Sequence, residues 1–145
     1  MSDSRIHFFL EGVSYPIRNK EKLRQWLDMV ITSENESYHD INIILCTDEF
    51  LHELNLTYLS QDRFTDVLTF DFSEADMVAS GDIYISLPRV QENARKFGVS
   101  VKDEIHRVIV HGILHLAGYD DQRVMDKKRM TEKENHYLSL RAKGL

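Results

Sequence analysis

The chain has 145 residues, of which 42% are hydrophobic and 29% are charged, and its formal net charge is −6. This length fits a single domain over residues 1–145. Without an apolar run of about 18 residues, we expect neither a membrane span nor a membrane partner. The single cysteine excludes an intrachain disulfide. The apolar stretch near the N-terminus is too short for a signal peptide, so we expect a cytoplasmic protein.

Short segments rich in β-branched and aromatic residues predict strands, and longer segments with apolar residues at helical spacing predict helices. In chain order we expect a strand at 6–10, a helix at 20–32, a strand at 41–46, a helix at 48–59, strands at 66–72 and 81–87, and helices at 88–97, 100–116 and 125–141. The segment that joins the last two strands is too short for a crossover helix, so these strands should pair antiparallel. The pattern predicts an α+β fold: one mixed β-sheet of about four strands, covered by about five helices.

Several residues suit the ends of the expected helices. Asp48 and Ser100 are candidate N-caps, because their side-chain oxygens can accept a hydrogen bond from a free N–H of the first turn. Pro88 suits a first helical turn, and Gly98 suits the end of the same helix.

The charge is distributed unevenly along the chain. Residues 1–87 contain 6 Lys and Arg against 16 Asp and Glu, which gives −10, and residues 88–145 contain 12 against 8, which gives +4. A basic second half is a weak indication of an anionic partner, and solvated helix faces would explain it equally well.

The segment HGILHLAGYDD, residues 111–121, contains a candidate metal site. His111 and His115 are four residues apart, so on a helix they project from one face about one turn apart. Zinc enzymes with the H-E-x-x-H motif use this spacing, but the glutamate of that motif is absent here. His106 falls about 140° around the helix from His111 and should lie off this face. The structural alternative is a buried helix that merely contains histidines.

The residues after the second histidine can complete such a site. Gly118 can adopt the left-handed conformation that ends helices, and a reversal there can bring Asp120 or Asp121 back over the histidines. Two histidines and one carboxylate would give a catalytic zinc ion three protein ligands and one open position. The site is therefore expected at the C-terminal end of a buried helix.

HGILHLAGYDD resembles the signature of the YbeY family, H-G-x-L-H-L-x-G-Y-D-H. Residues 54–70 resemble the family's segment that ends in its T-D-V-L-S-F strand, and residues 81–94 resemble its G-D-I-x-I-S strand and the following helix. The resemblance implies a compact α+β fold and a zinc-type ion held by the signature histidines. It also implies a single-strand-specific, metal-dependent endoribonuclease in 16S rRNA 3′-end maturation and ribosome quality control.

Carried over to this chain, the metal ligands implied by the family are His111, His115 and Asp121, which stands where the family has a third histidine. A carboxylate ligand lowers the net charge of the site and weakens the ion as a Lewis acid. Zn²⁺ is the expected ion. Fe, Mn or Ni are alternatives, because two histidines and a carboxylate also form the facial set of non-haem iron enzymes.

Two further positions depart from the family. Leu59 stands where the family usually has an arginine that is thought to contact RNA near the metal, and Phe64 stands where it favours proline. Arg63 is a candidate replacement for that arginine, and Asp66, at the start of the family-like strand, is a catalytic candidate. Glu104 is another, although it lies too far along the helix from the histidines to be a ligand and is more simply a surface charge. The sequence identifies no general base.

RNA, specifically rRNA, is the expected substrate, without DNA specificity, and the ribosome or ribosomal proteins are expected partners. The candidates for substrate binding are Arg89, Arg107, Arg123 and Tyr119. Two other functions remain open. One is a ribosome assembly factor whose metal is mainly structural, and the other is a metallohydrolase of another substrate, such as a peptide or a small molecule.

Overall fold

The computed structural model describes residues 5–35, 37–73 and 78–145. The elements are β1 (Ile6–Glu11), α1 (Lys20–Glu34), β2 (Tyr38–Cys46), α2 (Asp48–Leu59), β3 (Val67–Asp71), β4 (Ala79–Ser86), α3 (Leu87–Phe97), α4 (Val101–Leu116) and α5 (Val124–Ser139). The described strands form one sheet in the order β1-β2-β4-β3. β1, β2 and β4 are parallel, and β3 runs antiparallel to β4. The predicted α+β fold and the antiparallel pair are confirmed. Of the segment that joins β3 and β4, residues 74–77 lie outside the described residues.

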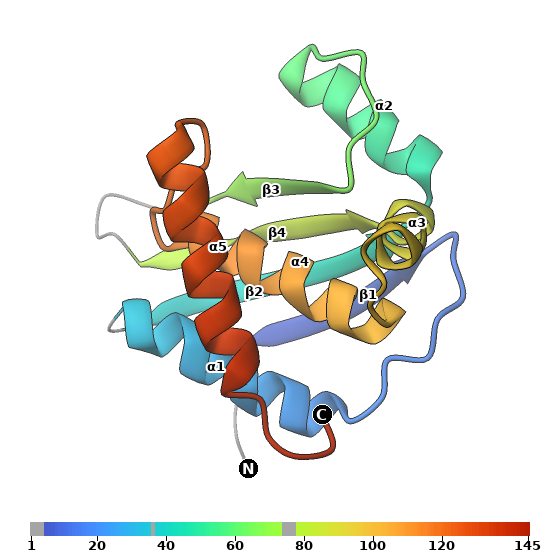
Figure 1. Ribbon diagram of the computed structural model, residues 1–145. Helices are drawn as coiled ribbons and strands as arrows, with labels where there is room; N and C mark the ends of the chain where they lie inside the picture. The colour runs from blue at the N-terminus through green and yellow to red at the C-terminus, as the bar shows by residue number, and fades with distance from the viewer. Residues whose placement is uncertain (1–4, 36, 74–77) are drawn as a thin grey trace.

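Helices α1, α4 and α5 lie over one face of the sheet (Figure 1) and share one hydrophobic core with it. Ile83 and Ile85 of β4 pack there with Ile109 and Ile113 of α4, and all four side chains are buried. On the opposite face, α2 packs a smaller cluster through Leu51. No helix in the described part of the chain is long and apolar enough to cross a membrane.

Gly112 lets α4 approach the sheet closely. A Cβ atom at this position would lie only 2.8 Å from a methyl carbon of Ile83 on β4. Since real Cβ atoms essentially never approach other heavy atoms this closely, a side chain here would force either Ile83 or α4 to shift. The glycine between the two histidines therefore sets how deep the helix lies.

Most of the expected helix ends are found. The Ser100 hydroxyl caps α4 by accepting a hydrogen bond from the N–H of Asp103, Pro88 lies in the first turn of α3, and Gly98 ends that helix with φ +67°. The predicted N-cap at Asp48 is wrong. Thr47 caps α2 by accepting from the N–H of Phe50 at 3.1 Å, so Asp48 falls inside the helix and its carboxylate pairs with Arg89 instead.

Candidate metal centre

The two histidines of α4 and the acidic pair after it meet at the end of the helix. The Nε2 atoms of His111 and His115 are 3.0 Å apart, and Oδ2 of Asp121 lies 3.3 Å from the first and 3.5 Å from the second. Among the described residues these three are the group of histidine, cysteine and acidic side chains that could hold one metal ion. The Asp120 carboxylate instead accepts from the N–H groups of Asp121 and Gln122.

The reversal after α4 explains why a residue beyond the helix reaches back to the histidines. Gly118 has φ +103°, a left-handed conformation that favours glycine. The N–H of Gly118 donates to the carbonyl of His115, and the N–H of Tyr119 donates to that of Leu114. These bonds close the helix and turn the chain back over its last turn.

Each imidazole is oriented through its other ring nitrogen. Nδ1 of His111 lies 2.7 Å from Oε2 of Glu134 on α5, and Nδ1 of His115 lies 2.9 Å from the carbonyl oxygen of Tyr119. A carbonyl or a carboxylate oxygen can only accept, so both Nδ1 atoms carry the proton and donate. The two Nε2 lone pairs and the Asp121 oxygen therefore converge as acceptors that repel one another. A cation relieves that repulsion, so the donor set fits a divalent metal.

The carboxylate of Glu134 is buried, with only 6% of the residue exposed. It accepts from His111 and, at 2.9 Å, from the guanidinium of Arg107. Burial alone would lower the pKa of His111, but the hydrogen bond and charge of Glu134, together with Asp121 and Asp66, raise it overall. The same negative surroundings that attract a proton attract a metal cation.

The cluster lies in a pocket of about 480 Å³ between the end of α4 and β3. Arg63 and Asp66 both line this pocket, so the structure brings these two candidates to the metal ligands. The buried amide of Asn55 on α2 donates to the carbonyl of Arg63 at 3.0 Å. This bond anchors the loop that carries the arginine.

Interpreting Glu104 as a surface charge is wrong. Only 6% of the residue is exposed, because α5 packs beside α4 at this turn and brings Glu134 close to it. Burial, with the nearby charges of Asp66 and Glu134, raises the pKa of Glu104 against the opposing charge of Arg107. Glu104 does not line the metal pocket but a neighbouring one between α4 and α5.

The described residues that line the metal pocket include none of the four substrate-binding candidates. Arg89 pairs with Asp48 at 2.9 Å, and Arg107 is held by Glu134. The hydroxyl of Tyr119 donates to Glu34 at 2.8 Å, which leaves its main-chain carbonyl as its link to the cluster. Arg123 is exposed at the N-terminus of α5 and makes no ion pair with any described residue.

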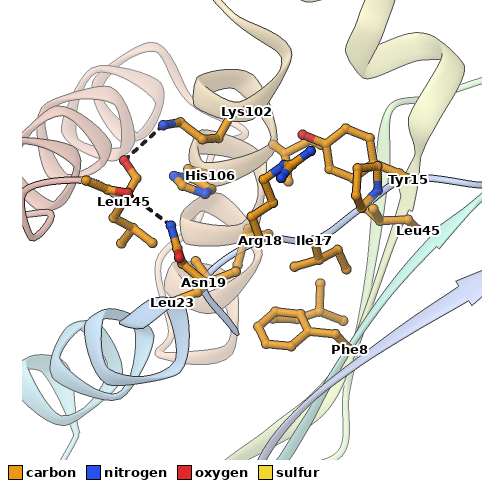
Figure 2. A pocket seen from close by; sticks show the side chains of 15 residues that line it. Phe8, Tyr15, Ile17, Arg18, Asn19, Leu23, Leu45, Lys102, His106 and Leu145 are labelled. Carbon is orange, nitrogen blue, oxygen red and sulfur yellow. Dashed lines mark hydrogen bonds between the residues drawn. The ribbon is translucent and has the colours of Figure 1, made fainter. Parts of the chain in front are cut away.

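His106, the third histidine of α4, lies off the metal face as predicted. It lines an apolar cavity of about 350 Å³ at the start of α4 (Figure 2). Its Nδ1 atom lies 3.0 Å from the guanidinium of Arg141 and accepts from it. Burial, and the positive charges of Arg141 and Lys102, lower the pKa of His106 to about 4.

Sequence reasoning missed Glu134 and Asn55. The sequence of α5 is dominated by charged residues, which favours an exposed helix. A signal was nevertheless present, because Met130, Glu134 and Tyr137 are spaced four and three apart and form the buried stripe of α5. A carboxylate on an apolar stripe needs a buried partner, and here the partners are His111 and Arg107.

The fold and the cluster define a small α+β protein with a histidine–carboxylate site able to hold a metal ion. A family model described as Endoribonuclease YbeY matches residues 11–141. The chain belongs to the YbeY family, and the resemblance found in the sequence is thereby confirmed.

Relatives match nearly the whole chain. It is 43% identical to the endoribonuclease YbeY of Cytophaga hutchinsonii, over 97% of this chain and 99% of that protein. It is 41% identical to the endoribonuclease YbeY of Bacteroides thetaiotaomicron, over 94% and 98%. The solution structure of TM1509 from Thermotoga maritima is similar with a TM-score of 0.65 at 37% identity, and the match covers 91% of this chain and 87% of that one.

Proposed function

We propose that this protein is a metal-dependent endoribonuclease that cleaves single-stranded rRNA in the cytoplasm, in 16S rRNA 3′-end maturation and ribosome quality control. The observation that carries the proposal is the convergence of three acceptors, two imidazole Nε2 atoms and the Asp121 carboxylate, in an open pocket. Membership of a family whose relatives are named endoribonucleases supports RNA as the substrate. The ribosome or its proteins are the proposed partners.

We infer that His111, His115 and Asp121 hold the ion, and that Zn²⁺ is the ion. Their neutral nitrogen and anionic oxygen donors suit zinc, and three protein ligands leave a position for substrate or water. When bound, the ion supplies Lewis-acid stabilisation of the charge that develops on the reacting phosphate. Fe, Mn and Ni are alternatives, because two histidines and a carboxylate also form the facial set of non-haem iron enzymes.

The other residues of the pocket have distinct proposed roles. Arg63 supplies a positive charge that can pair with a phosphate of the substrate. The carboxylate of Asp66 lies close enough to raise the pKa of His111. It is the proposed acceptor of the proton from the nucleophile, which is either water or the 2′-hydroxyl next to the reacting phosphate. Glu134 and the carbonyl of Tyr119 fix the two imidazoles.

A cleavage assay on single-stranded RNA tests the proposal. Wild-type protein loaded with zinc should cleave the RNA, and either a chelator or His111→Ala should abolish cleavage. His136→Ala, which changes an exposed histidine of α5, should cleave like the wild type. Cleavage that survives both the chelator and His111→Ala would exclude the proposed site. Tight metal binding without any cleavage would instead support an assembly factor with a structural metal.

A further inference from the structure

β3 is an edge strand, with β4 on one side and no described strand on the other (Figure 1). Asp66 and Phe72 lie directly opposite β4 residues and bond to them through their main chains, at 2.9 and 2.8 Å. Since bonded and non-bonded pairs alternate along an antiparallel ladder, the main chains of Val67, Thr69 and Asp71 point away from β4. No described residue pairs with the N–H groups on this free edge.

This free edge borders the metal pocket. Val67, Thr69 and Asp71 line it together with the histidines and Asp121. Leu68 also lines it, although its side chain packs into the small cluster on the opposite face of the sheet. Leu68 can therefore reach the pocket only through its main chain, so the backbone of β3 forms part of the wall.

Besides Arg63, the neutral side chains of the pocket that can donate are those of Thr65, Thr69 and Gln122. Arg63 is its one cationic side chain among the described residues, whereas Asp66, Asp71 and Asp121 are acidic. A substrate phosphate next to the metal therefore needs neutral donors, which carboxylates cannot supply. Main-chain N–H groups at the edge of a sheet are such donors and bind anions without adding charge.

We propose that the free edge of β3 is a binding track for the RNA strand, in which the N–H groups of Val67 and Thr69 donate to phosphate oxygens. The outward carbonyls of the same two residues suit the 2′-hydroxyls, which are donors that RNA carries and DNA lacks. This inference rests on the proposed function and adds where the substrate lies: along β3, beside His111 and His115.

An extended peptide could pair with the same edge by adding a strand. RNA is favoured because Arg63 and the metal ligands share the pocket with this edge, so phosphate, cation and N–H donors meet in one place. A peptide would need none of these charges, since strand addition uses the main chain alone. Peptide pairing is therefore treated as one outcome of the test.

Proline at position 69 tests the track, because it removes an outward N–H and no bond to β4. Thr69→Val is the matched control, since it also lacks the hydroxyl but keeps the N–H. Binding of a fluorescent single-stranded RNA that keeps its 2′-hydroxyls is measured by anisotropy on chelator-treated protein, which should not cleave it, and KM and kcat are measured on the same RNA with zinc-loaded protein. We expect Thr69→Pro to raise Kd and KM about tenfold relative to Thr69→Val, because a bond to a charged acceptor is lost. Zinc content and kcat should stay within about twofold of the control.

Equal Kd and KM values for Thr69→Pro and Thr69→Val would contradict the proposal that RNA binds along β3 and would leave the proposed nuclease function intact. Loss of binding to an extended peptide, with unchanged RNA binding, would also contradict RNA binding along β3 and identify a protein-docking edge. If the wild type neither binds nor cleaves RNA, the proposed function itself fails. Should Thr69→Pro not fold, replacing the Thr69 amide by an ester keeps the side chain and removes only the N–H, and the same outcomes apply.

Discussion

Two histidines on one helix, His106 and His111, have opposite environments although they are five residues apart. His106 packs against Trp26, with ring centroids 5.4 Å apart, and faces the cations Arg141 and Lys102, which help lower its pKa to about 4. His111 faces the carboxylate of Glu134, and its pKa is raised. Nδ1 of His106 accepts a hydrogen bond from Arg141. Nδ1 of His111 donates one to Glu134, so its Nε2 atom is free to bind a metal. Burial and two cations disfavour a positive charge at His106, whereas His111 has an acidic partner and lies beside two further candidate ligands.

Replacing His111 should have the largest effect, which is on zinc binding. His111→Ala removes a ligand, so we expect more than about 100-fold weaker zinc binding, since even an orienting partner contributes up to that amount. His106→Gln should bind zinc like the wild type. Chelator competition and metal analysis of the purified proteins measure both. Zinc loss from His106→Gln alone would reverse the assignment of the two environments.

Low pH should destabilise the protein through protonation of His106. The pKa of His106 is near 6.5 when unfolded and about 4 when folded. Its contribution to stability is therefore complete above pH 6.5 and is lost as the pH falls towards 4, because the unfolded chain binds the proton more tightly. The loss should amount to about 3 kcal/mol.

Urea unfolding of chelator-treated protein between pH 7 and pH 4 measures this loss. His106→Gln should flatten the pH dependence by that amount, whereas His136→Gln, on the exposed face of α5, should retain the slope of the wild type. An unchanged slope in His106→Gln would show that this imidazole is not held neutral by its surroundings.

A smaller effect on zinc affinity is expected from changing Glu134, which orients His111. Glu134→Gln keeps the shape but weakens the bond to His111, so zinc affinity should fall about 10- to 100-fold. Glu132→Gln, on the exposed side of the same helix, is the control. Isothermal titration with zinc measures both variants, and equal affinities would mean that Glu134 serves only to pair with Arg107.

The smallest expected effect concerns exposed cations near the two ends of α4. Arg123→Gln, next to the metal pocket, should weaken RNA binding about threefold and reduce the slope of log K against log salt by about 1. Lys102→Gln, at the apolar end, should leave both unchanged. RNA titrations at several salt concentrations measure the affinity and its salt dependence for both variants. Equal effects of the two substitutions would show that RNA does not bind preferentially near the metal pocket.

The sequence predicted the elements that depend on local pattern. Helical spacing placed His111 and His115 on one face, and Gly118 marked the reversal that returns Asp121 to them. Contacts between distant segments could not be predicted, because no local pattern indicates that α5 packs beside α4 and places Glu134 next to His111. Spacing alone left Asp120 and Asp121 open as ligands, and the family resemblance indicated Asp121; in the structure the Asp120 carboxylate accepts from main-chain N–H groups of its own loop instead.

Gly112 has a consequence for attempts to redesign this centre. Peptidases with the H-E-x-x-H motif carry their general base directly after the first histidine, which corresponds to position 112 here. In this protein that position faces Ile83 on β4. A Gly112→Glu substitution would drive a carboxylate into hydrocarbon and force either Ile83 or α4 to shift, so protease chemistry is not one mutation away from this scaffold.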